Sequence, residues 1–139
     1  MTDGLDQALA GAGLALLAAD TSLTVYDGKV PAGTTPPYVL VYTSVDHPSE
    51  DEDNPVSGLT RVWLARWICH CVGGFGEDGS AARAVAQRVR TALLDVRPTV
   101  SGLSCGLIRF ESGDPPQRDE TTGSLLMDVV VTYRCKATS

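Results

Sequence analysis

The stretch that decides the fold is "LTRVWLARWICHCV", residues 59–72. Large apolar side chains recur at every second position, which is the period at which the side chains of a β-strand share a face. One face of this strand would carry the five residues Trp63, Ala65, Trp67, Cys69 and Cys71. We therefore expect a long strand whose two tryptophans lie in the core or in a subunit interface.

Further segments with strand-like patterns lie on both sides of this one. They are residues 38–46 ("YVLVYTSVD"), 103–112 ("LSCGLIRFES") and 124–135, with a short strand or bridge at Val25 and Tyr26. Residues 38–46 have apolar side chains on both faces, which is typical of a strand that is covered on both sides. The Pro- and Gly-containing segment 113–123 is predicted to be a polar turn.

Two segments have the spacing of amphipathic helices, residues 4–19 and 80–97. Pro98 would end the second helix. The order of these elements predicts an α+β fold, in which two helices pack on one face of a mixed, mainly antiparallel sheet of about four to five strands. The length of 139 residues favours a single domain over residues 1–139.

The charge of the chain limits its partners. The formal net charge is −6, so a protein that coats DNA through its phosphates is disfavoured. No apolar run approaches the roughly 18 residues that a membrane helix needs, and we expect no contact with a membrane. Residues 47–58 form an acidic loop, in which Glu50, Asp51, Glu52 and Asp53 must face water or a partner.

The four cysteines raise the question of a metal site. Cys69 and Cys71 would point to one side of their strand and His70 to the other, so these three residues cannot close on one ion. In an antiparallel sheet Cys105 and Cys135 could lie near Cys69 and Cys71, which leaves a four-thiolate metal protein open as an alternative. Small buried cysteines are common in strands, so this is the preferred explanation of the pattern and no metal site is expected.

No residue pattern indicates an enzyme. The chain lacks a G-x-S-x-G nucleophile motif, and it has only two histidines from which to build a catalytic triad. The glycine-rich segment "GGFGEDGS" at residues 73–80 lacks the lysine of a phosphate-binding loop. We therefore expect neither catalytic residues nor a cofactor.

The segment "VYDGKVPAGTTPPYVLVY", residues 25–42, joins a short apolar pair to a strand through a Pro- and Gly-rich elbow. With the helix before it, this segment resembles the pattern of tail-terminator proteins of bacteriophages, also called tail-completion or minor tail proteins. The matching positions are Val25, Tyr26, Asp27, Val30, Pro31, Pro36, Pro37, Tyr38 and Val39. The order of the later elements is similar over nearly the whole chain.

The resemblance implies a structural virion protein. Such a protein forms a hexameric ring that caps the tail tube, ends tube polymerisation and docks the tail to the head–tail connector or neck protein. Its partners would be further copies of itself, the major tail tube protein and the connector, and DNA would pass through its lumen without specific binding. It would act in the virion tail after assembly in the bacterial host cytoplasm.

Three sets of residues are candidates for these contacts. The acidic loop at Glu50, Asp51, Glu52 and Asp53 would face the lumen, where it would repel DNA, or else the outer, connector-facing surface. The helix arginines Arg83, Arg90 and Arg97 would make inter-subunit contacts. The elbow residues Pro31, Pro36, Pro37 and Tyr38 would fix the direction in which the loop leaves the body.

Two other functions remain open from the sequence. A head-closure or neck connector protein would share the small body and the ring. A cytosolic binding module of the host would have a pocket against Trp63 and Trp67.

Overall fold

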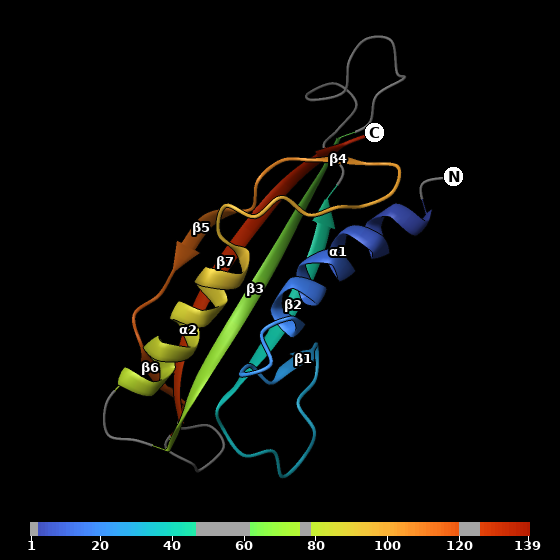
Figure 1. Cartoon of the computed structure of the whole chain (residues 1–139). Helices are drawn as coiled ribbons and strands as arrows, with labels where there is room; N and C mark the ends of the chain where they lie inside the picture. The colour runs from blue at the N-terminus through green and yellow to red at the C-terminus, as the bar shows by residue number, and fades with distance from the viewer. Residues whose placement is uncertain (1–2, 47–61, 76–78, 120–125) are drawn as a thin grey trace.

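The computed structural model describes residues 3–46, 62–75, 79–119 and 126–139. Figure 1 shows the chain and its labelled elements. In the described residues these elements are α1 (Asp3–Ala18), β1 (Val25–Asp27), β2 (Tyr38–Asp46), β3 (Val62–Phe75), α2 (Ser80–Leu93), β4 (Ser104–Cys105), β5 (Arg109–Gly113), β6 (Gln117–Asp119) and β7 (Leu126–Thr138).

All the strands belong to one sheet, in the order β1-β2-β3-β7. The short segments β4, β5 and β6 all pair with β7, so that together they extend the sheet beyond it. β1 and β2 are parallel and every other described pair is antiparallel. The predicted α+β class with a mixed, mainly antiparallel sheet is confirmed. Within the described residues the sheet has seven strands instead of four to five, because three short segments divide its last edge.

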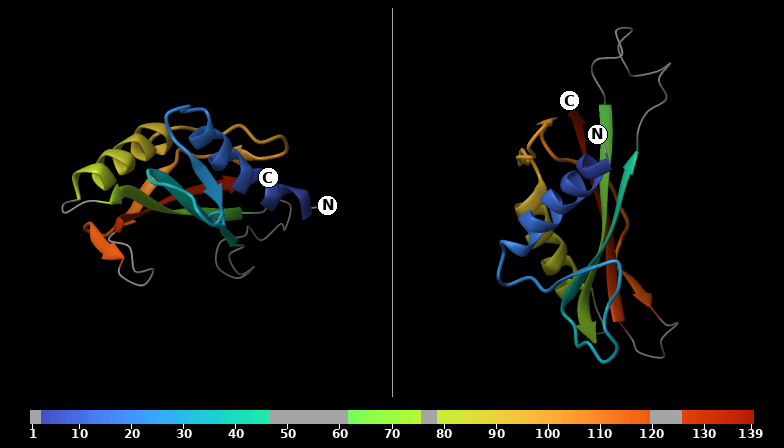
Figure 2. Two further views of the ribbon diagram at one scale, coloured as in Figure 1. Left: turned by 90° about the horizontal axis from the view of Figure 1, so that it is seen from below. Right: turned by 90° about the vertical axis from the view of Figure 1, so that its right-hand side faces the viewer.

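Both helices lie on the same face of the sheet, as Figure 2 shows. α1 packs over β2 and β3, and α2 packs over β3 and β7. The apolar alternation in the strands places one set of side chains under the helices, as expected from their period of two. The largest fully buried side chains are Trp63, Trp67, Tyr133, Leu9, Leu17, Leu93 and Ile108.

Two glycines bring the helices close to β3. The indole of Trp67 lies against Gly13 of α1, and its Nε1 donates a hydrogen bond of 3.0 Å to the carbonyl oxygen of Ala10. A Cβ added to Gly73 would stand 2.0 Å from the backbone nitrogen of Ala82 in α2. Gly73 is also the extra residue at the irregularity in the β3–β7 register. Because Gly13 and Gly73 have no side chain, both helices can pack closely on this strand.

The second helix is shorter than the sequence predicts. It ends at Leu93, and the backbone of Leu94 is already extended. Asp95 then has a φ of +61°, and its backbone N–H donates to the carbonyl of Ile108. Hydrogen bonds to a distant segment thus replace the last helical turn, and the prediction that the helix reaches residue 97 and is ended by Pro98 was wrong.

The predicted strand at 103–112 is divided in two. Between β4 and β5, Gly106 N–H still donates to Lys136 of β7, but Ile108 N–H donates to Val96, which follows α2. The predicted polar turn at 113–123 contains β6, which pairs with the start of β7. The prediction of a strand at 38–46 matches β2, and those at 59–72 and 124–135 are shifted to β3 and β7.

The face of the sheet opposite the helices is partly open to solvent. In β2, Val39 and Val41 are fully buried under the helices, whereas Tyr42 on the opposite face is 45% exposed. The prediction that both faces of this strand are covered is therefore wrong for the described chain. The apolar residues on the open face interact across strands instead, and the ring of Tyr42 meets that of His70 edge-on at 5.5 Å.

Candidate functional site

The Pro- and Gly-rich elbow connects the parallel strands β1 and β2. Thr34 donates two hydrogen bonds to the carbonyl of Pro31, from its hydroxyl at 2.6 Å and from its backbone N–H at 3.2 Å. Gly28 and Gly33 have φ values of +75° and +81°, which side chains rarely allow. Local hydrogen bonds and left-handed glycines thus give the loop a defined path.

The far end of the elbow is joined to the sheet. The Pro36–Pro37 peptide is cis, and Val39 N–H then donates to the carbonyl of Thr24. The ring of Tyr38 meets that of Tyr26 edge-on, with 5.9 Å between centroids. The structure brings the predicted elbow residues Pro36, Pro37 and Tyr38 together at the start of β2, next to β1.

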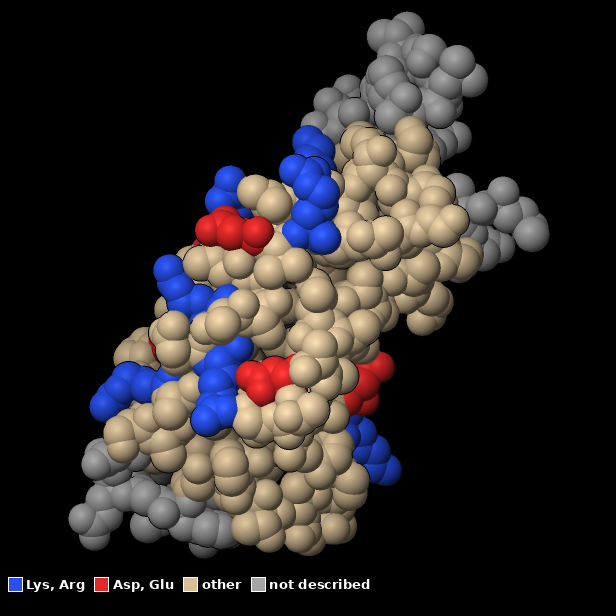
Figure 3. Space-filling view, viewed as in Figure 1, with Lys and Arg blue, Asp and Glu red and all other residues tan. Residues whose placement is uncertain are grey.

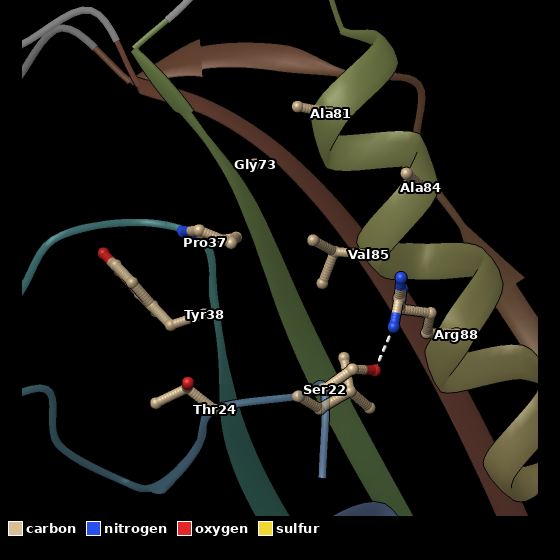
Figure 4. Close-up of a pocket in the computed structure, with 10 residues that line it drawn as sticks. Ser22, Thr24, Pro37, Tyr38, Gly73, Ala81, Ala84, Val85 and Arg88 are labelled. Atoms are coloured by element: carbon tan, nitrogen blue, oxygen red, sulfur yellow. Dashed lines mark hydrogen bonds between the residues drawn. The ribbon is translucent and has the colours of Figure 1, made fainter. Parts of the chain in front are cut away.

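A pocket of about 280 Å³ lies between the elbow and α2. Figure 4 shows Pro37 on one side of it and Val85 and Arg88 on the other, with Gly73 behind on β3. Arg88 donates a hydrogen bond to the hydroxyl of Ser22. Hydrogen bonds from Ser22 and the nearby Arg88 guanidinium both lower the pKa of Asp20, the hydrogen bonds more strongly.

The exposed side of α2 is positively charged. The helix sequence "SAARAVAQRVRTAL" contains three arginines and no acidic residue. Arg83 and Arg90 are both exposed and stand seven residues apart, which puts them on one side of the helix. Figure 3 shows Lys and Arg side chains gathered over α2 and the region beside it.

Between α2 and β5 runs a groove of about 260 Å³, which we call the α2–β5 groove. Its lining consists of Arg83, Ala86, Gln87, Arg90, Phe110, Val131 and Tyr133. Phe110 is 45% exposed, and its ring meets the buried ring of Tyr133 edge-on at 5.8 Å. Phe110 was not predicted from the sequence, although an aromatic residue within the polar stretch "RFES" was a signal for it.

The third predicted contact arginine lies elsewhere. Arg97 is beyond the end of α2, and its Nη1 donates a hydrogen bond of 2.6 Å to the carbonyl of Cys105. Part of its donor capacity therefore holds the segment after α2 against β4. Arg83 and Arg90 line the same groove, and Arg97 is not among the residues that line it.

The open face of the sheet has its own charges. Arg66 donates from Nε to both carboxylate oxygens of Glu111 at 3.0 Å, and its Nη1 forms an ion pair of 2.8 Å with Asp46. These contacts join β2, β3 and β5 across the sheet. Arg134 and Lys136 are exposed on the same face of β7, next to a pocket of about 400 Å³.

The four thiols lie in two separate places. Cys69 and Cys71 face the helices, and Cys69 is paired in register with Val131, four residues from Cys135 along β7. Cys135 and Cys105 are neighbours near the other end of the sheet. Burial raises the pKa of Cys69 to about 12 and that of Cys135 to about 11. In the described part of the chain, no three His, Cys, Asp or Glu side chains gather as metal ligands would.

The predicted acidic loop, with Glu50, Asp51, Glu52 and Asp53, lies outside the described residues. The segments outside the described residues hold seven acidic residues and one basic residue, Arg61. The described body is therefore electrically balanced, and these segments carry the whole net charge of −6. Among the described helices, none is both long and apolar enough to cross a membrane.

Comparison with known proteins places the chain among the structural proteins of bacteriophage virion tails. The model of the family described as "Tail completion protein gp17" matches residues 5–136. The chain belongs to this family, and the resemblance seen in its sequence is confirmed.

The fold also occurs in a solved structure. A chain of the "Virion of native gene transfer agent (GTA) particle" superposes with a TM-score of 0.72 at 17% sequence identity. The match covers 96% of this chain and 96% of that chain, so the two share one fold from end to end. No curated protein matches the chain.

Proposed function

We propose that this protein caps the phage tail tube, ends tube polymerisation and docks the tail to the head connector. It acts as a ring, a hexamer in the family it resembles, whose lumen passes DNA. Membership of the tail completion family over residues 5–136 is the observation that carries this proposal. The direct partners would be the major tail tube protein, the head–tail connector protein and further copies of the chain.

The distribution of charge supports a ring. A closed ring built from one kind of subunit needs two different, complementary surfaces on each copy. The exposed arginines of α2 provide a positive surface on a neutral body, and the acidic segment at 50–53 is negative. Arg83 and Arg90 are therefore proposed as inter-subunit residues. Arg97 lies outside the groove and donates to Cys105, so it is proposed to contribute only positive charge near this contact.

The acidic segment could serve a second purpose in the assembled virion. Carboxylates at Glu50, Asp51, Glu52 and Asp53 in the lumen would repel phosphates and keep the genome from adhering. Replacing all four residues by Asn or Gln should then slow genome ejection. Normal ejection with defective ring assembly would instead place the segment at a contact between proteins.

The experiment that tests the main proposal is removal of the gene from a producing phage. We expect tail tubes of uneven and excessive length that do not join heads, measured by electron microscopy of negatively stained lysates. Supplying the protein from a plasmid should restore one tail length. Tails of normal length beside heads that have lost DNA would instead support the head-closure alternative.

A further inference from the structure

We propose that the α2–β5 groove binds the acidic segment Glu50–Asp53 of a neighbouring copy of this chain. This inference rests on the proposed ring and names the surfaces through which it closes.

The lining of the groove combines apolar, aromatic and positively charged side chains. Its floor is apolar and aromatic, formed by Ala86, Val131, Phe110 and Tyr133. Its rim carries the guanidinium groups of Arg83 and Arg90. An exposed aromatic ring beside arginines is the combination found at the centres of protein interfaces.

The nearby described carboxylates are already engaged elsewhere. Asp95 forms an ion pair of 2.5 Å with Arg109, and Glu111 binds Arg66. In the described ranges, neither Arg83 nor Arg90 has a carboxylate within ion-pair distance. The rim of the groove is therefore suited to a ligand that brings its own negative charge.

The chain itself contains such a ligand. Glu50, Asp51, Glu52 and Asp53 are consecutive, and no other part of the sequence has three acidic residues in a row. Pro55 and Val56 follow two residues later, and these can supply apolar contacts for the floor. The described body has no net charge, and the segments outside it carry the whole net charge of −6. Attraction between the acidic segment of one copy and the groove arginines of another is therefore favourable.

Arg83 lies far along the sheet from Asp46, the last described residue before the acidic segment. Ala82 lies level with Gly73 of β3, because a Cβ on Gly73 would stand 2.0 Å from its nitrogen. Asp46, the last described residue before the segment, pairs with Leu64, nine residues earlier on β3. At about 3.3 Å per residue, roughly 30 Å separate these two levels.

The length of the chain limits contact within one copy. Glu50 and Asp51 come four and five residues after Asp46, so their Cα atoms reach about 18 Å from it at most, which stops short of the level of Ala82 and Arg83. Arg90 lies nearer to Asp46, because the end of α2 approaches Arg66 of β3 through Asp95 and Arg109, so the mixing experiment below is needed to separate the two sources. A neighbouring copy has no such limit, and a contact from segment to groove repeated around a ring leaves no free end.

Charge reversal tests this contact. The first variant carries Glu50→Lys, Asp51→Lys, Glu52→Lys and Asp53→Lys, and the second carries Arg83→Glu and Arg90→Glu. The matched control carries Arg134→Glu and Lys136→Glu, two exposed cations on the open face of the sheet. Circular dichroism would establish that all three fold. We expect each of the first two variants to weaken association on the order of 100-fold, and the control to leave it unchanged.

A mixture of the first two variants is the decisive sample. In an alternating ring each positive segment meets a negative groove and each negative segment meets a positive one. We therefore expect a one-to-one mixture to recover the native mass of the wild-type ring, although neither variant forms it alone. Contact within one copy could not be restored in this way, and failure of the mixture would overturn the inference.

The result with the wild-type chain separates the two proposals. A wild-type ring that both reversed variants still form would overturn the groove contact and leave the ring standing. A wild-type chain that stays monomeric, both alone and on isolated tail tubes, would overturn the ring and the contact together. Native mass spectrometry and sedimentation at low salt give both readouts.

Discussion

The indole of Trp67 in β3 fills the space that a side chain on Gly13 of α1 would need. A Cβ at Gly13 would lie 2.2 Å from Cε2 of the indole. The same indole donates to the carbonyl of Ala10, so the ring is held from two sides. The position of α1 on the sheet depends on this pair.

Gly13→Ala should therefore lower the free energy of unfolding. Forcing a methyl group into a filled core costs about 1–3 kcal/mol, which exceeds the gain of up to about 1 kcal/mol from better helix propensity. Urea unfolding followed by tryptophan fluorescence measures the change. The control is Gly11→Ala, where nothing lies within 4 Å, and this variant should be stabilised. Equal stability of the two variants would contradict the packing described for α1.

Asp95 has a backbone conformation that favours asparagine, aspartate or glycine. Its φ is +61°, and this residue turns the chain out of α2. Asp95→Val should destabilise the protein by about 1–2 kcal/mol, because a branched side chain is strained in the left-handed region. Asp95→Asn keeps the local preference and should cost less, since the exposed ion pair with Arg109 contributes little. Thermal unfolding compares the two, and an equal loss in both would assign the effect to charge.

Buried thiols predict a loss of stability at alkaline pH. The pKa of Cys69 is raised to about 12 by burial, from an ordinary value of 9.0. The folded state therefore holds the proton that the unfolded state releases, so the stabilisation is complete below pH 9 and is lost as the pH rises toward 12. The loss reaches about 1.4 kcal/mol per pH unit for one such group.

Denaturation midpoints at pH 8, 9, 10 and 10.5 measure this slope. Cys69→Ala should lower stability at pH 8 through the lost side chain, but it should also make the decline above pH 9 shallower. Because Cys69 is buried, thiol reagents should react with it only after unfolding. An unchanged slope in Cys69→Ala would assign the alkaline effect to other groups, such as Tyr133, whose pKa burial raises to about 12.

Phe110 and Tyr42 are two exposed aromatic residues whose substitution allows a matched comparison of the two faces of the sheet. Each is 45% exposed, and each has one edge-on aromatic contact, but they lie on different faces of the sheet. Phe110→Ser should cost about 1 kcal/mol of stability or less while weakening subunit association about tenfold. Tyr42→Ser should have a similar effect on stability and leave association unchanged. The reverse pattern would move the subunit contact to the open face.

The sequence patterns predicted the layers of this fold more reliably than the ends of its elements. The alternation through Trp63 and Trp67 and the helical stripe of α2 report burial on one face, which local sequence encodes directly. The end of α2 depends on hydrogen bonds between Asp95 or Val96 and Ile108, residues more than ten positions apart. Nothing in the local pattern reveals such a pairing. Pro98 therefore lies five residues beyond Leu93, the last residue of the helix.

The candidate site was only partly visible in the sequence. Arginines on a helix are easily seen, and Arg83 and Arg90 do lie together on an exposed surface. Their neighbour across the groove, Phe110, comes from β5, a strand that is distant in sequence from α2. Arg97 has helical spacing in the sequence but lies beyond the helix, which separated it from the other two.

The shortness of β1 has a consequence for handling the free protein. β1 pairs with β2 only from Val39 to Val41, and no other described strand borders the outer edge of β2 from Tyr42 to Asp46. Such an edge offers backbone donors and acceptors on which another polypeptide can add as a strand, in register or out of it. Free copies of this chain at high concentration are therefore prone to wrong pairing through this edge.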